Sequence, residues 1–139
     1  MLRKGDDDVY TLTYPVGKDA QFPLIDIASD MGKYVAAALK NRSAVLRVQF
    51  FAAADYYTPA RILAESEEVT GKKTRFFQVD SETYNTGQMG QEMLENHLFI
   101  ESPGQFMGQS LKESHDLPEQ AGYLPTTWKA FLEQNKSSL

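Results

Sequence analysis

The sequence contains no cysteine, which excludes disulfides, thiolate metal sites and cysteine nucleophiles. It has only two histidines, His97 and His115, and no helix face groups either of them with carboxylates, so we expect no metal site. No apolar run reaches the roughly 20 residues that span a bilayer. Lysine and arginine total 14 against 19 acidic residues, a net charge of −5, whereas nucleic-acid binding calls for a basic surface. We therefore expect neither a membrane nor a nucleic acid as a partner.

The start of the chain, residues 1–8, also lacks the apolar stretch of a signal peptide. A chain of 139 residues with 42% hydrophobic residues fits one domain. A domain of this size buries roughly two-thirds of the surface that its unfolded chain exposes. We expect a single domain over residues 1–139 with frayed ends at residues 1–8 and 135–139, and a cytoplasmic localisation.

Alternating strand and helix patterns predict an α/β fold with a small mixed sheet and flanking helices. Residues 9–14 and 21–26 are predicted strands joined by a turn, and Pro23 places the second strand at an edge because it donates no ladder hydrogen bond. Residues 45–54 form the longest apolar run, which predicts a strand covered on both faces. Residues 75–79 are a further predicted strand.

The helices are predicted from spacing and capping residues. Thr58 is a good N-cap, Pro59 suits the first helical position, and Gly71 is a plausible stop. The buried side of this helix is expected to consist of Ile62, Leu63, Ser66 and Val69. An earlier helix is expected to bury one apolar face made of Met31, Tyr34, Val35, Ala38 and Leu39. Shorter helices are expected at 81–84, 90–100 and 126–132, and residues 103–125 are predicted to be an irregular loop.

Candidate chemistry follows the longest apolar run. Asp55, Tyr56 and Tyr57 lie at the carboxyl end of that predicted strand, where ligands gather in open α/β sheets. Asp55 is a candidate proton donor or acceptor, or it stabilises the turn and the helix start. Tyr57 is a candidate hydrogen-bond donor to a ligand, or a packing residue.

His97 shares a predicted helix face with Met93 and Leu94. It is a candidate general acid or base near neutral pH, or a partly buried histidine bonded to backbone. Methionine and aromatic side chains adapt to irregular ligands, so we expect them to line a pocket for an apolar substrate. The candidate substrate-binding residues are Tyr56, Phe22, Met93, Phe106 and Met107.

Residues 53–62, 68–73, 77–79, 92–98 and 125–128 resemble the NmrA-like family, a branch of the atypical short-chain dehydrogenase/reductases abundant in filamentous fungi. The resemblance covers nearly the whole chain. It implies the C-terminal, substrate-side half of such a protein. The glycine-rich turn that places a dinucleotide at a helix N-terminus is missing from the sequence, so no cofactor is expected on this chain alone.

These features lead to the hypothesis of a cofactor-independent small-molecule enzyme of a fungal-type secondary-metabolite pathway. It would be an isomerase, dehydratase or cyclase, with Asp55, Tyr57 and His97 as catalytic residues. The alternatives are a non-catalytic NmrA-like binding or regulatory module, and a fragment of an NAD(P)-dependent reductase. Loss of the dinucleotide-binding half would expose a strand edge and apolar side chains, so we also expect a homodimer.

Overall fold

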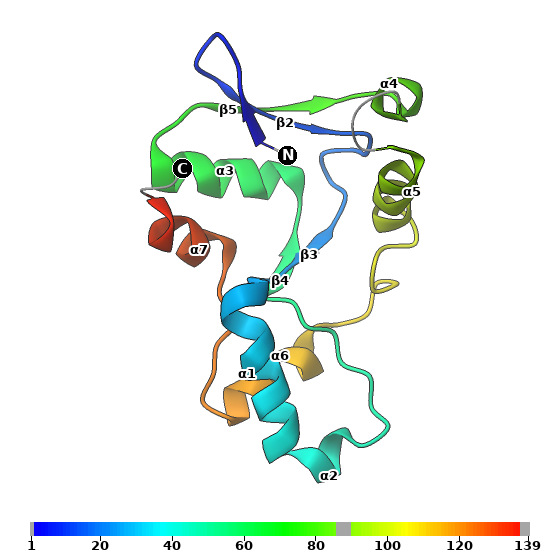
Figure 1. Cartoon of the computed structure of the whole chain (residues 1–139), viewed down its shortest axis with the longest axis vertical. Coiled ribbons are helices and arrows are strands. Elements are labelled where there is room, and N and C mark those ends of the chain that lie inside the picture. Colours follow the sequence, from blue (N-terminus) through cyan, green and yellow to red (C-terminus); the bar gives the residue numbers. More distant parts are fainter. Residues whose placement is uncertain (1, 86–89, 137–139) are drawn as a thin grey trace.

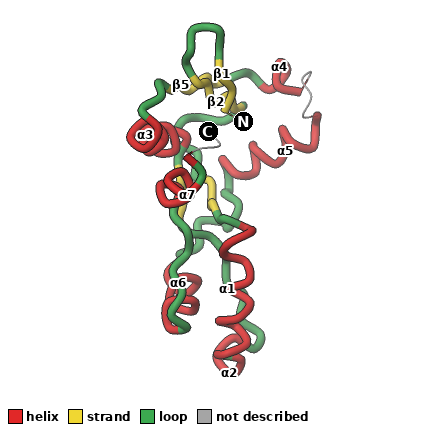
Figure 2. The backbone as a smooth tube through the Cα atoms, turned by 60° about the vertical axis from the view of Figure 1, so that its left-hand side comes forward, coloured by secondary structure: helices red, strands yellow, loops and turns green. Residues whose placement is uncertain are grey.

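The computed structural model describes residues 2–85 and 90–136, apart from the side chains of Ala44 and Glu113. It has two lobes joined by a narrower middle (Figure 1). The middle is a two-stranded antiparallel sheet of β3 (Phe22–Leu24) and β4 (Asp55–Tyr57). The lower lobe consists of α1 (Ile27–Lys40), α2 (Arg42–Val45) and α6 (Lys112–Gln120). Figure 2 shows α1 and α6 side by side in this lobe.

The upper lobe is built on a mixed three-stranded sheet, as the sequence predicts. Its strands are β1 (Leu2–Lys4), β2 (Tyr10–Tyr14) and β5 (Thr74–Gln78), in the order β1-β2-β5. Strand β2 pairs antiparallel with β1 and parallel with β5. Strand β1 lies in a segment that was expected to be frayed. Its pairing is favoured by a tight turn in which Gly5 N donates to Val9 O at 2.9 Å.

Helix α3 (Pro59–Thr70) packs against β5 and against α7 (Trp128–Gln134). Its predicted ends are confirmed: Thr58 Oγ1 accepts from Arg61 N at 3.1 Å, and Gly71 caps the helix with φ of 70°. The left-handed conformation at Gly71 is one that glycine adopts without a steric penalty. The predicted buried residues of α3 are buried, together with Pro59.

Helices α4 (Ser81–Asn85) and α5 (Gly90–Glu101) lie at the side of the upper lobe, close to their predicted positions (Figure 1). Helix α5 buries Leu94, His97 and Ile100. Ile100 packs in a core cluster with Val16 and Phe22, which ties this helix to the segment before β3. Helix α7 ends at Gln134, directly before the second expected frayed end at 135–139, of which residues 137–139 lie outside the described part.

The predicted strand at residues 45–54 is wrong. Val45 ends α2, residues 46–54 are irregular, and Leu46 and Val48 are 60% and 49% exposed. Isolated hydrogen bonds hold this segment: among them, Phe51 N donates to Ser114 Oγ at 2.7 Å, and Ala54 N donates to Leu24 O at 2.7 Å. A strand covered on both faces needs neighbouring strands. Among the described residues no strand pairs with this segment, and β3 pairs with β4 alone.

The predicted buried face of α1 is also largely wrong. Met31, Val35 and Leu39 are 40%, 53% and 72% exposed, whereas Asp30, Tyr34 and Ala37 are buried. The side of α1 that contains Asp30 and Tyr34 faces the interior because both side chains form hydrogen bonds there. Asp30 Oδ2 accepts from Thr126 N at 2.6 Å, and Tyr34 Oη donates to Ala53 O at 2.9 Å.

Helix α6 replaces part of the predicted loop at 103–125. Pro118 is compatible with this helix because it stands near the C-terminal end of α6, where its missing N–H removes one hydrogen bond. Leu111 and Leu117 are buried, which gives the short helix an apolar side.

Candidate ligand-binding site

A cavity of about 430 Å³ lies between one face of the upper sheet and helices α3 and α7. Its walls are formed by β2, α3 and α7, which contribute among others Tyr10, Leu12, Tyr14, Ile62, Ser66 and Trp128. Tyr10, Leu12 and Tyr14 alternate along β2 and therefore point to the same face of the sheet. On α3, Ile62 and Ser66 stand one turn apart and so share one helix face.

The hydroxyl groups in the helical wall are used within the wall itself. Ser66 Oγ donates to Ile62 O at 2.6 Å and accepts from Trp128 Nε1 at 3.2 Å. Thr70 Oγ1 donates to Ser66 O at 2.6 Å. Because these protons already have acceptors, the wall presents mainly carbon to the cavity.

Trp128 is held in place by polar contacts on both its backbone and its ring. Its backbone N donates to Tyr57 Oη at 3.0 Å, and Nε1 also donates to Ile62 O at 3.1 Å. The indole stacks on Phe131, with ring centroids 5.6 Å apart. A fixed indole is a preorganised surface for an apolar ligand.

Two polar side chains differ from the rest of the lining. Burial raises the pKa of Tyr14, so its phenol stays protonated through the physiological range. Lys72 is the one charged side chain among the described lining residues, and its Nζ lies 5.0 Å from the centroid of the Tyr10 ring.

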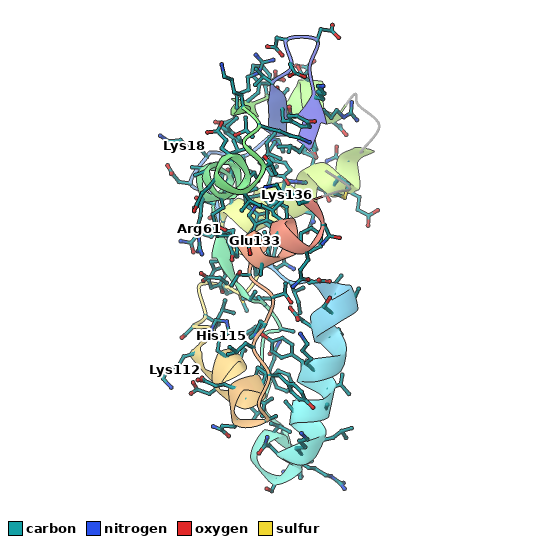
Figure 3. All side chains as sticks on the ribbon, turned by 90° about the vertical axis from the view of Figure 1, so that its left-hand side faces the viewer. Lys18, Arg61, Lys112, His115, Glu133 and Lys136 are labelled. Carbon is teal, nitrogen blue, oxygen red and sulfur yellow. The ribbon has the colours of Figure 1, made fainter. Side chains whose placement is uncertain are left out.

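Asp55 and Tyr57, two candidates from the sequence, both contact Arg61 of α3, which is labelled in Figure 3. Asp55 Oδ2 accepts from Arg61 Nη1 at 2.7 Å, and this pairing raises the pKa of Arg61. The Arg61 guanidinium lies 4.1 Å from the centroid of the fully buried Tyr57 ring. Burial raises the pKa of Tyr57, whose hydroxyl accepts from Trp128 N. Asp55 is the first residue of β4, and its carboxylate pairs with a residue of the first turn of α3.

His97, Phe22 and Met93 form a second group. The Nδ1 of His97 lies 2.7 Å from Met93 O. This is the kind of backbone contact expected if His97 is a buried structural histidine. The imidazole packs against Tyr14, with centroids 4.8 Å apart, and against Phe22, with centroids 6.0 Å apart. His97 is 5% exposed, so its ring is enclosed by neighbours of this chain.

Tyr56 and Phe106 meet in a smaller groove of about 220 Å³ that also includes Asp19 and Glu101. Tyr56 Oη donates to Gln109 O at 2.8 Å, and its ring lies 6.2 Å from the Phe106 ring, centroid to centroid. Met107 is 67% exposed. The structure thus places seven of the eight candidates in separate groups and Met107 in none of them, and none of the eight lines the larger cavity.

The residues of the larger cavity were not selected as site residues from the sequence. Ser66 gave the clearest signal, as a polar residue among the apolar members of a predicted buried helix side. Within residues 2–85 and 90–136, no group of three or more His, Cys, Asp or Glu side chains is placed to hold a metal ion. No helix in the same ranges is long and apolar enough to cross a membrane.

Comparison with known proteins places this fold. Residues 1–132 match the NmrA-like family. The chain belongs to this family. A double-mutant NmrA has a similar crystal structure, with a TM-score of 0.72 and 16% identity over 97% of this chain. A nucleoside-diphosphate-sugar epimerase from Staphylococcus aureus gives a TM-score of 0.65 and 20% identity over 88% of this chain.

The NmrA-like chain spans 46% of the NmrA structure and 43% of the epimerase structure. At these identities the likeness establishes the fold, which agrees with the α/β fold predicted from the sequence. No curated protein is similar enough to the chain to count as a match.

Proposed function

We propose that this chain is the small-molecule-binding part of an NmrA-like protein and that it holds an apolar ligand in the cavity beside Trp128. The observation that carries the proposal is the cavity itself. Its volume of about 430 Å³ and its walls of leucine, isoleucine and aromatic side chains are typical of ligand pockets. The function is then that of a binding module.

The lining favours binding over catalysis. A general acid or base must lie within hydrogen-bond reach of the proton that it moves. The described lining residues include no carboxylate and no imidazole. The hydroxyl protons of Ser66 and Thr70 are already donated to backbone oxygens of α3.

The sole tryptophan makes this proposal directly testable, because Trp128 lines the cavity. Decanol is a suitable neutral probe, and its titration should change Trp128 fluorescence saturably. Ile62→Phe narrows the cavity and should weaken the binding about tenfold or more. Ile27→Phe is the matched control, because Ile27 is 69% exposed on α1 and should leave the affinity unchanged. A non-saturable signal, or equal affinities in a folded Ile62→Phe variant, would contradict the proposal.

The cofactor-independent isomerase, dehydratase or cyclase is a second candidate function, favoured by the smaller groove. That groove combines Tyr56 and Phe106 with two acidic residues, Asp19 and Glu101. Turnover of candidate substrates without nucleotide would support it. Asp19→Asn and Glu101→Gln, which change the acidic residues of the groove, should then lower the rate. Unchanged rates in Asp55→Asn, Tyr57→Phe and His97→Ala would reject the catalytic residues assigned from the sequence. Saturable NADPH binding, followed by Trp128 fluorescence, would instead support the reductase alternative.

A further inference from the structure

We propose that the natural ligand of the larger cavity is an amphipathic anion, an apolar body carrying one carboxylate, and that Lys72 selects the anionic head group. The proposal rests on the proposed function, because it names the ligand class of the same cavity. It starts from the contrast between apolar walls and Lys72, the single charged residue in the described part of the lining.

Lys72 is placed by elements that are well defined in the fold. It follows Gly71, the left-handed cap of α3, and it precedes β5. Its backbone N donates to Thr70 Oγ1 at 3.2 Å, which fixes the direction in which the chain leaves the helix. The residue is half-buried and lines the cavity, an arrangement in which a lysine covers apolar surface with its methylene stem and keeps its ammonium group hydrated.

The Tyr10 ring steadies the ammonium group of Lys72. Nζ lies 5.0 Å from the ring centroid, within the range of a cation–π contact. The same ring is part of the cavity wall. A ligand packed against Tyr10 therefore brings its polar end close to a positive charge.

The position of Lys72 at the end of α3 suits a positive charge, because the C-terminal end of a helix favours a cation. Asp8, which is fully exposed, also interacts with Lys72, but the pKa of Asp8 is lowered mainly by its hydrogen bond to Lys4. A fully exposed carboxylate is a weak competitor for a ligand head group because water screens its charge.

The walls exclude other ligand classes. A strongly polar ligand would lose its water and gain few hydrogen bonds in return, since the Ser66 and Thr70 protons already have acceptors and most of the lining is carbon. A ligand with an ammonium head would place a second positive charge beside Lys72. A neutral alcohol would fill the apolar part of the cavity and gain nothing from Lys72, whereas a carboxylate gains a charge-assisted hydrogen bond.

Three ten-carbon probes with the same tail and different heads test this inference: decanoate, decanol and decylamine. Trp128 fluorescence reports binding of each one. We expect the wild-type chain to bind decanoate about threefold to tenfold more tightly than decanol, and decylamine more weakly than both. Rising salt should reduce the decanoate advantage and leave decanol unaffected.

The variant Lys72→Met keeps an apolar stem and removes the charge, so it should remove the preference for decanoate and retain decanol binding. Lys73→Met is the matched control. It changes the neighbouring lysine, which is exposed and does not line the cavity, and should preserve the preference. Equal binding of decanoate and decanol to the wild type, or a preference that persists in Lys72→Met, would overturn the role of Lys72. Failure of all three probes to bind would instead contradict the proposed function.

Discussion

The two lobes of the molecule cover their apolar side chains differently. In the upper lobe the sheet, α3 and α7 enclose Leu12, Tyr57, Ile62 and Leu63, all less than 9% exposed. In the lower lobe α1 presents an apolar ridge to solvent at four-residue spacing, made of Ile27, Met31, Val35 and Leu39. The upper lobe is therefore stabilised mainly by apolar burial, and it contains the cavity.

The interior of the lower lobe is held by hydrogen bonds. Asp30 is fully buried and accepts from Thr126 N at 2.6 Å and from Thr126 Oγ1 at 2.9 Å. Ala53 O lies 2.9 Å from the Tyr34 hydroxyl and 3.1 Å from His115 Nε2 of α6 (Figure 3). Polar networks of this kind specify geometry, but each lost partner leaves a buried group unsatisfied.

The homodimer expected from the sequence stays a prediction, and it has the largest expected effect. A second copy would cover the α1 ridge, which lies beside the small residues Ala28, Gly32 and Ala36. Light scattering at micromolar concentration should give twice the mass of one chain. The variant Val35→Glu should halve that mass, while Leu98→Glu on α5 should keep it. A wild-type monomer would contradict this prediction.

The next largest expected effect is a difference in stability between side-chain truncations in the two lobes. Leu12→Ala removes a side chain that is 3% exposed, and it should lower the free energy of unfolding by about 2–5 kcal/mol. Leu39→Ala changes a side chain that is 72% exposed on α1, and it should cost less than about 0.5 kcal/mol in the monomer. Urea unfolding of both variants checks the contrast. Equal losses would mean that the α1 ridge is covered in solution.

Helix α3 shows why part of the fold follows from the sequence. Thr58, Pro59 and Gly71 act through contacts within the helix and its caps, so neighbouring residues contain the whole signal. The orientation of α1 was not predictable in this way, because Asp30 finds its partner Thr126 96 positions away. The apolar run at 45–54 indicated burial, but the absence of a pairing strand in the described fold is a tertiary property.

The cavity, too, could be predicted from the sequence only in part. Alternation along β2 and the spacing on α3 predict which faces hold Leu12 and Ser66. That these faces meet around Trp128 depends on contacts between residues far apart in the chain, such as the bond from Trp128 Nε1 to Ser66 Oγ, 62 positions away. Candidate residues chosen by chemistry alone, such as Asp55, found partners within this chain.

Removal of one buried charge should lower the stability of the lower lobe. Asp30→Asn removes the carboxylate that pairs with Lys33 at 2.8 Å and accepts two hydrogen bonds from Thr126. It should lower the free energy of unfolding by about 1–3 kcal/mol. Asp26→Asn is the control on the same helix, because asparagine is an equally good N-cap and should cost about 0.5 kcal/mol or less. A neutral Asp30→Asn would show that the buried contact does not stabilise the lobe.

Alkaline pH offers a second test of the lower lobe. Burial, together with Asp30, raises the pKa of Tyr34 from 10.0 to about 12. The folded state therefore holds the proton more tightly, so the stabilisation is complete below pH 10 and is lost as the pH rises from 10 to 12. The wild type should lose about 2 kcal/mol more across this interval than Tyr34→Phe, measured by urea unfolding at each pH. Parallel pH curves for the two proteins would show that Tyr34 titrates normally.

The smallest effects come from two glycines, one on a helix of each lobe, that should respond oppositely to alanine. Gly71 has φ of 70°, which an alanine adopts only with strain, so Gly71→Ala should destabilise the chain by about 1 kcal/mol. Gly32 lies inside α1, and a Cβ built there meets no atom within 4 Å. Gly32→Ala should therefore stabilise the monomer by about 0.5–1 kcal/mol through helix propensity. Differential scanning calorimetry of both variants decides the signs. If Gly32→Ala destabilises the protein instead, and does so more at high protein concentration, a partner must approach α1 at this residue and the ridge is an interface.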